Sequence, residues 1–185
     1  MGLENCEVQK PSSRRLDNNN DCVVVRNDIK CLMTNFESLL SKFDEFTVKI
    51  LEVKPDIIFG TETWLKNDIT DDFINIPGFL SFRTDTSEVR GGVIIYVKDT
   101  LQAHLCEQLN NLKVKDTLWI WVRNSGKPDN LFGVVYRKGD SSQEHNTRVL
   151  KQLEKAISIC KGKIMVTGDF NLPLIDWKNC MVQIG

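Results

Sequence analysis

The spacing of apolar side chains changes twice between residues 29 and 60. Apolar and polar residues alternate over positions 29–35, which predicts a largely buried β-strand that ends at Asn35. Apolar residues then recur at the spacing of an amphipathic helix from Phe36 to Leu51, and Pro55 ends that helix. Residues 56–60 form a short apolar run of strand length. A strand, a helix and a second strand in close succession predict a parallel β-α-β unit.

The middle of the chain has a different pattern, with short apolar runs between turn-forming residues. Five candidate strands cover residues 79–82, 92–98, 103–109, 117–123 and 131–136. Such closely spaced strands predict a mostly antiparallel meander. Trp119 and Trp121 share one face of their strand, and we expect both to be packing residues.

Helical spacing returns at residues 143–160, followed by a last strand at 163–167. The predicted apolar side of this helix carries Val149, Leu150, Leu153, Ile157 and Cys160. Residues 1–27 are polar and predict a disordered segment, with a short edge strand at 23–25. The chain therefore predicts one α/β domain, residues 28–185, with mixed sheets covered by helices.

Composition narrows the functional classes. The 185 residues include 24 basic and 25 acidic ones, and this balance argues against a strongly basic polyanion binder. The six cysteines lack the spacing of a metal site and there are two histidines, so zinc is not expected. We expect reduced cysteines in an intracellular protein. The first ten residues carry no apolar run, and no stretch has the length of a membrane span.

Polar side chains follow three of the predicted strands. Asn35 follows the first strand, Glu62 the second, and Asp169 with Asn171 the last. If these strands are neighbours, the four side chains converge at the carboxyl edge of the sheet. Glu62 is then the natural ligand for Mg²⁺, which is bound through one or two carboxylates and water. Each position also has an ordinary structural interpretation: a helix cap at Thr34 or Asn35, an exposed acid, and a Gly-Asp turn.

Two further positions leave both interpretations open. Tyr136 and Arg137 end a strand and could contact phosphate, although a tyrosine at a sheet edge is equally expected from packing alone. His145 is expected to be a solvated residue at a helix start. His104 is expected to face solvent or a partner.

Five segments in the same order resemble the endonuclease/exonuclease/phosphatase superfamily, and within it the endonuclease domain of non-LTR (LINE-type) retrotransposons. They are TNFESL at 34–39, KPDII with TETWL at 54–65, RGGVIIYV at 90–97, VYR at 135–137, and GDFNLP with IDW at 168–177. The resemblance spans roughly residues 28–178.

The resemblance implies a four-layer αββα sandwich and Mg²⁺-dependent phosphodiester cleavage, with Mn²⁺ as an alternative ion. Its implied substrate is chromosomal DNA in the nucleus, nicked to prime a reverse transcriptase carried in a longer product. By the same resemblance, Glu62 binds the metal and Asn35 orients metal and phosphate. Tyr136 contacts the scissile phosphate, Asp169 positions or activates water, and Asn171 holds the phosphate.

The chain departs from the family pattern at functional positions. The family's C-terminal S-D-H motif is absent, and neither His104 nor His145 matches its histidine. We therefore expect a sandwich that lacks its C-terminal strands and cleaves weakly or not at all. The alternatives are an inactive domain remnant that binds DNA or a protein, and a different superfamily chemistry such as phosphate-ester hydrolysis of a small molecule.

Overall fold

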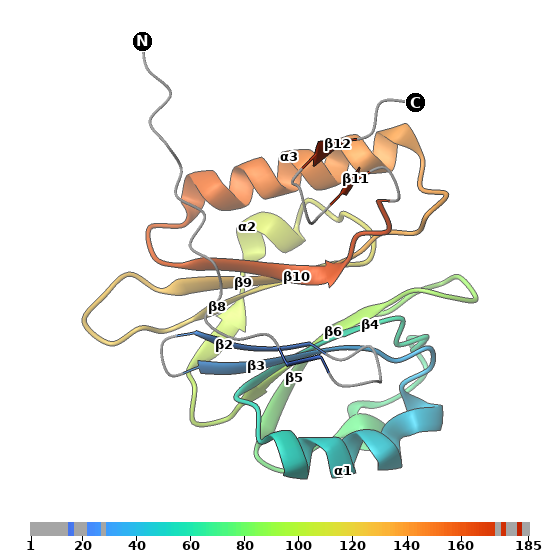
Figure 1. The fold of residues 1–185 in the computed structure, drawn as a ribbon, viewed down its shortest axis with the longest axis vertical. Coiled ribbons are helices and arrows are strands. Elements are labelled where there is room, and N and C mark those ends of the chain that lie inside the picture. The colour runs from blue at the N-terminus through green and yellow to red at the C-terminus, as the bar shows by residue number, and fades with distance from the viewer. Residues whose placement is uncertain (1–14, 17–21, 27–28, 173–174, 177–180, 183–185) are drawn as a thin grey trace.

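Two mixed β-sheets pack face to face, and helices cover both outer faces (Figure 1). The computed structural model describes residues 15–16, 22–26, 29–172, 175–176 and 181–182. The layers run α3, four-stranded sheet, six-stranded sheet, α1, as in the predicted αββα sandwich.

The six-stranded sheet contains the predicted β-α-β unit. Its strand order is β1 (Arg15–Leu16), β2 (Cys22–Arg26), β3 (Ile29–Asn35), β4 (Ile57–Thr61), β6 (Val93–Lys98), β5 (Phe79–Thr84). β3 and β4 are parallel, with Asn35 opposite Thr61, and the other pairs are antiparallel. A short 3₁₀ turn, η2 (Asp71–Ile74), precedes β5.

The first helix begins later than the sequence predicts. A 3₁₀ turn, η1 (Leu40–Lys42), leads into α1 (Phe43–Val53), so neither Thr34 nor Asn35 caps the helix. The segment before it instead turns alongside the end of β4. The amide groups of Phe36, Ser38 and Leu39 donate to the carbonyls of residues 61, 62 and 63 at 2.9, 3.0 and 3.0 Å. The predicted helix start at Phe36 is wrong because Glu37 and Ser38 have left-handed backbones, with φ of 46° and 93°, which a right-handed helix does not accommodate.

The four-stranded sheet has the order β10 (Ile164–Asp169), β9 (Asn130–Tyr136), β8 (Thr117–Val122), β7 (Ala103–Leu105). β9 and β10 are parallel and the other pairs antiparallel. The five middle strands thus do not form one meander, because β6 already has β4 and β5 on its two sides and leaves no edge for β7.

The predicted strand at 103–109 is shorter than expected and ends in a helical turn, α2 (Glu107–Asn110). Asn110 fixes this turn on β8: its Nδ2 donates to the Trp119 carbonyl at 2.8 Å, and its Oδ1 accepts from the Trp119 amide at 3.0 Å. The hydrogen bonds between Asn110 and Trp119 therefore stabilise a helical turn where the sequence predicts the end of the strand.

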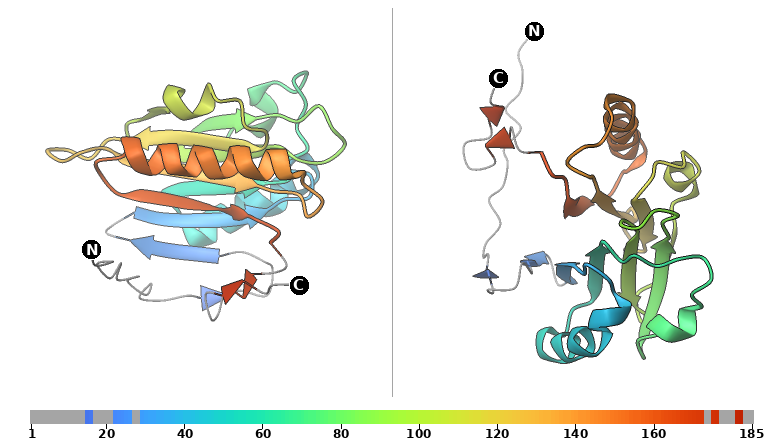
Figure 2. Two further views of the ribbon diagram at one scale, coloured as in Figure 1. Left: turned by 90° about the horizontal axis from the view of Figure 1, so that it is seen from above. Right: turned by 90° about the vertical axis from the view of Figure 1, so that its right-hand side faces the viewer.

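The second main helix, α3 (Gln143–Ile159), runs across the outer face of the four-stranded sheet (Figure 2). Ser142 caps it by accepting from the His145 amide at 3.1 Å. Its buried face is rotated from the predicted one. Val149, Gln152 and Ala156 are buried, whereas Leu150 and Ile157 are 58% and 69% exposed. Gln152 is buried because its Nε2 donates to the Leu109 carbonyl at 3.1 Å.

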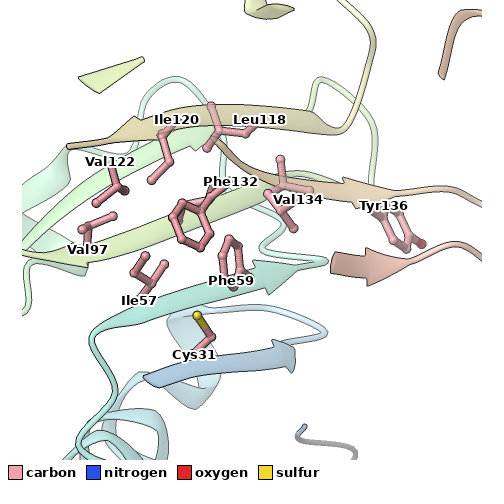
Figure 3. Packing of buried hydrophobic residues seen from close by; sticks show 12 residues of the cluster. Cys31, Ile57, Phe59, Val97, Leu118, Ile120, Val122, Phe132, Val134 and Tyr136 are labelled. Carbon is pink, nitrogen blue, oxygen red and sulfur yellow. The ribbon is translucent and has the colours of Figure 1, made fainter. Parts of the chain in front are cut away.

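The main hydrophobic core lies between the two sheets (Figure 3). Phe59 of β4 and Phe132 of β9 meet across it with ring centroids 6.3 Å apart. Trp119 is fully buried under α2 and α3, and Trp121 packs against the same cluster, so both have the predicted packing role. This core fixes the position of one sheet relative to the other.

The predicted strand at 23–25 is present as β2, although it pairs with both β1 and β3 and is not an edge. Most of the N-terminal segment expected to be disordered lies outside the described residues. Within residues 29–172, Cys31, Cys106 and Cys160 are free thiols. No helix in the described parts of the chain is long and apolar enough to cross a bilayer. Near the C-terminus, β11 (Ile175–Asp176) and β12 (Met181–Val182) form an antiparallel pair.

Candidate active site

The predicted site residues lie at the carboxyl ends of two parallel strand pairs. In the six-stranded sheet Asn35 is in register with Thr61, the residue before Glu62. In the four-stranded sheet Tyr136 is in register with Asp169. The negative charges of Glu62 and Asp169 both act on the Tyr136 phenol, so groups from the two sheets lie close together at this point.

Glu62 is held by donors on both carboxylate oxygens. Asn35 Nδ2 donates to Oε1 at 3.1 Å, and Trp64 Nε1 donates to Oε2 at 3.4 Å. Asn35 is itself oriented by the Thr61 hydroxyl, which donates to its Oδ1 at 3.2 Å. Glu62 and Trp64 have left-handed backbones, with φ of 53° and 56°. The segment therefore turns sharply at the strand end and presents its carboxylate in one fixed orientation.

A double glycine holds that turn. The carbonyls of Gly91 and Gly92 accept from the amides of Trp64 and Thr63 at 2.9 and 3.3 Å. Both glycines have positive φ, and a Cβ on Gly92 would lie 2.5 Å from Thr63 Oγ1. The two glycines of the RGG motif thus stabilise the turn that carries Glu62.

Asp169 and Asn171 form a local turn rather than a shared strand face. β10 ends at Asp169, and Asn171 has a left-handed φ of 44°. Its amide and Nδ2 donate to the two oxygens of Asp169 at 3.2 and 3.0 Å, and Nδ2 also donates to the Arg137 carbonyl at 3.0 Å. The two side chains therefore lie close together through this turn and not through the alternation of a strand.

Burial raises the pKa of the Asp169 carboxyl, and the nearby charge of Glu62 adds to the effect. A carboxylate with a raised pKa is a better proton acceptor than an ordinary aspartate. It lines an open cavity of about 770 Å³, together with Gly139, Gly168, Phe170, Leu172 and Ile175.

Tyr136 is a neutral hydrogen-bond donor at the edge of the inter-sheet core. Burial, and then the charges of Glu62, Asp169 and Asp116, raise its pKa to about 12. Its hydroxyl is directed away from the rings of Phe59 and Phe132 (Figure 3). The phenol is thus available to the site while the ring packs against the core.

Arg137 does not supply the phosphate contact considered from the sequence. It is only 9% exposed. Its Nε donates to Asn146 Oδ1 at 2.7 Å, and its Nη1 donates to the Asn171 carbonyl at 2.6 Å. The guanidinium instead ties α3 to the turn that carries Asp169 and Asn171.

Asp116 is a site neighbour that the sequence did not reveal. It is buried, its Oδ1 accepts from the Gly92 amide at 2.7 Å, and its carbonyl accepts from the Tyr136 amide at 2.9 Å. Its partners lie far away in the chain, so no local pattern could identify it. Within residues 29–172, neither His104 nor His145 hydrogen-bonds to a site residue, as the motif comparison predicts.

The donor set fits an ion with oxygen ligands such as Mg²⁺ or Mn²⁺ rather than zinc. In the described residues no three His, Cys, Asp or Glu side chains come together as a ligand cluster. Mg²⁺ needs only one or two carboxylates and keeps most of its waters. Glu62, oriented by Asn35, and the nearby Asp169 meet that requirement.

Comparison with solved structures supports the fold. The endonuclease domain of TRAS1, a telomere-specific non-LTR retrotransposon, matches with a TM-score of 0.57 and 17% identity over 76% of this chain and 59% of its own. The Neisseria 3′ phosphatase NExo bound to product DNA hairpin matches with a TM-score of 0.61 and 19% identity, over 80% of this chain and 60% of its own. The Leishmania major AP endonuclease LMAP matches with a TM-score of 0.65 and 14% identity, over 90% of this chain and 62% of its own.

This chain therefore spans about 60% of the length of each of these three structures. No curated protein matches it by sequence. The family model described as endonuclease/exonuclease/phosphatase family matches residues 30–183, and the chain belongs to that family.

Proposed function

We propose that the chain is a divalent-metal-dependent DNA endonuclease domain of the non-LTR retrotransposon type, with a low rate of phosphodiester hydrolysis. The observation that carries the proposal is geometric: one parallel strand pair carries Asn35 and Glu62 at its carboxyl end, the other carries Tyr136 and Asp169, and the two sheets contact each other there. The retrotransposon assignment is supported by the five ordered motifs and by the fold shared with TRAS1. A reverse transcriptase domain in a longer product and a nuclear location belong to the same proposal.

The residues of the site divide the work of hydrolysis. Glu62, oriented by Asn35, would hold Mg²⁺, or Mn²⁺ in its place, and the ion would supply charge stabilisation at the phosphate oxygens. Tyr136 donates its hydroxyl proton in a hydrogen bond to a phosphate oxygen, since its raised pKa keeps it protonated. Asp169 orients a water molecule and accepts its proton as the new P–O bond forms.

Asn171 orients Asp169 in this proposal. A side-chain amide has two N–H donors, and those of Asn171 are directed at Asp169 and at the Arg137 carbonyl. The phosphate-holding role implied by the family resemblance would require it to release one of these bonds.

The expected low rate rests on His104 and His145. Within residues 29–172 neither imidazole hydrogen-bonds to a candidate catalytic residue, so the leaving oxygen takes its proton from solvent. A positioned acid or base typically contributes about 10²–10⁴-fold in rate, and we expect a loss of that size relative to a site that has one.

A supercoiled-plasmid nicking assay tests the proposal. Protein in large excess over plasmid is incubated for hours with Mg²⁺, with Mn²⁺ or with chelator, and the nicked form is quantified. We expect slow, metal-dependent nicking that Glu62→Gln and Asp169→Asn reduce to background. Asp68→Asn, an exposed acid in the loop after β4, is the matched control. Nicking equal in wild type and Glu62→Gln would overturn the function, and rapid nicking would overturn the predicted low rate.

A further inference from the structure

Two lysines, one just before a strand and one just after the next, hold one exposed glutamate beside the site. Lys115 precedes β8 and Lys138 follows β9, whereas Glu88 lies in the loop between β5 and β6. Lys115 Nζ donates to Glu88 Oε1, and Lys138 Nζ donates to Glu88 Oε2. One anionic group is thus held between two cations.

Both lysines are attached to the framework of the site. Lys138 is two residues beyond Tyr136, and the intervening Arg137 binds the turn at Asn171. Lys115 precedes the buried Asp116, whose carbonyl accepts from the Tyr136 amide at 2.9 Å. The backbone under each lysine is therefore fixed with respect to the candidate catalytic groups.

The Glu88 carboxylate is exposed to solvent at the tip of a loop whose backbone is fixed. The Glu88 side chain is 50% exposed, and the next residue, Val89, is 85% exposed. The loop backbone is held by Lys66, whose Nζ donates to the Glu88 carbonyl, and by Thr86, whose Oγ1 accepts from the Glu88 amide at 3.1 Å. In the described residues, the two lysines are the hydrogen-bonding partners of the Glu88 carboxylate. Exposed ion pairs of this kind are weak and are screened by salt.

We propose that Lys115 and Lys138 form a binding site for a backbone phosphate of DNA, and that Glu88 occupies this site in the free protein. A phosphodiester presents one negative charge over two free oxygens, as a carboxylate does, and two ammonium groups can hold either. The inference rests on the proposed function for the choice of DNA as the ligand.

A third cation favours a polyanion over an isolated acidic group. Arg90, two residues after Glu88, lies over the ring of Trp64 at 5.8 Å from its centroid. Trp64 donates to Glu62, so this cation lies beside the candidate metal ligand. A nucleic-acid backbone offers several phosphates in a row, and departure of Glu88 exposes the cations that receive them.

Fluorescence anisotropy with a labelled DNA duplex in chelator tests the site without cleavage. We expect Lys115→Gln and Lys138→Gln each to weaken binding about three- to tenfold at low salt and to reduce the slope of log K against log [salt] by about one. Glu88→Gln is expected to tighten binding by a similar factor. Lys138→Arg keeps the charge and should bind as wild type does.

Lys151→Gln and Glu154→Gln, exposed on α3, are the matched charge controls and should have little effect. Lysine variants that bind with wild-type affinity and salt slope would overturn the phosphate site, as would the absence of duplex binding by both wild type and Glu88→Gln. An unchanged affinity for Glu88→Gln would overturn its occupation by the glutamate. Nicking that depends on Glu62 but not on the lysines would retain the enzyme and remove this site. Lysine-dependent binding without nicking would retain the phosphate site and overturn the proposed enzyme.

Discussion

The side-chain amide of Asn35 donates to the Glu62 carboxylate across 3.1 Å, although the two residues are 27 positions apart in the chain. The contact follows from parallel pairing of β3 and β4, which brings both strand ends to one edge. It places an uncharged donor beside the group proposed to bind the metal.

Removing this donor should weaken metal binding. In Asn35→Ala the Glu62 carboxylate loses one orienting hydrogen bond, and such outer contacts are worth about 10-fold or more in metal affinity. Titration with Mn²⁺, followed by electron paramagnetic resonance of the free ion, measures the change. Asn67→Ala, at an exposed loop position, is the control. Equal Mn²⁺ affinities for Asn35→Ala and wild type would show that Asn35 does not support the ligand.

Gly168 should tolerate no side chain. Its φ is +143°, and a Cβ there would lie 1.8 Å from the Val135 carbonyl oxygen of the neighbouring strand. Gly168→Ala must push β10 away from β9, and we expect it to lower the free energy of unfolding by about 3 kcal/mol or more. Chemical denaturation measures this loss.

Gly139 provides the comparison for that substitution. A Cβ at Gly139 meets no atom within 4 Å. Gly139→Ala should therefore change the free energy of unfolding by no more than about 0.5 kcal/mol. Similar losses in the two variants would mean that the β9–β10 spacing is not what limits residue 168.

The guanidinium of Arg137 should stabilise the fold through its hydrogen-bond geometry as well as its charge. Lysine cannot reproduce simultaneous bonds to Asn146 and to the Asn171 carbonyl, so Arg137→Lys should destabilise the fold by about 2 kcal/mol. A double-mutant cycle with Asn146→Ala should give a coupling energy of about 1 kcal/mol, measured by denaturant unfolding. Strict additivity of the two losses would contradict a direct interaction in solution.

The tyrosines should resist ionisation in alkali. The chain has two, Tyr96 and Tyr136, and burial raises the pKa of both, that of Tyr136 to about 12. The folded protein should show almost no phenolate absorbance at the ordinary tyrosine pKa of about 10, whereas protein unfolded in denaturant should be half ionised there.

The same shift has a defined sign for stability. The folded state favours the neutral phenol, which raises its pKa. The neutral phenol therefore makes its full contribution to the free energy of unfolding below the ordinary tyrosine pKa. This contribution is lost as the pH rises through about 12, the folded value for Tyr136. Tyr136→Phe should reduce the alkaline dependence of unfolding. A folded-state titration near the ordinary pKa would show that Tyr136 is not desolvated.

The layers and most strands were predictable because period-2 and helical spacing record which side chains face a core. The start of α1 was not, because Phe36 and Leu39 are buried as the helical pattern requires but in a segment bonded to the end of β4. The division of the middle strands between two sheets was also hidden. It depends on β6 having both edges occupied, which is a property of the whole sheet.

The position of the candidate residues at strand ends was predictable, but their hydrogen bonds were not. Strand ends marked Asn35, Glu62 and Asp169, since parallel strands bring such ends together. The role of Arg137 stayed open because nothing local shows that its partner is Asn146 on α3. Asp116 lacked any local signal, because its partners, Gly92 and Tyr136, reach it only through tertiary contacts.

The two parallel strand pairs have a consequence for folding kinetics. β3–α1–β4 contributes Asn35 and Glu62, and β9–α3–β10 contributes Tyr136 and Asp169, so each unit contributes half of the site from a contiguous segment. Each half can form without the other, although its paired strands lie far apart in the sequence. The complete constellation exists only after Phe59 and Phe132 meet between the sheets. Chemical competence should therefore emerge late in refolding, in step with docking of the two units rather than with the appearance of secondary structure.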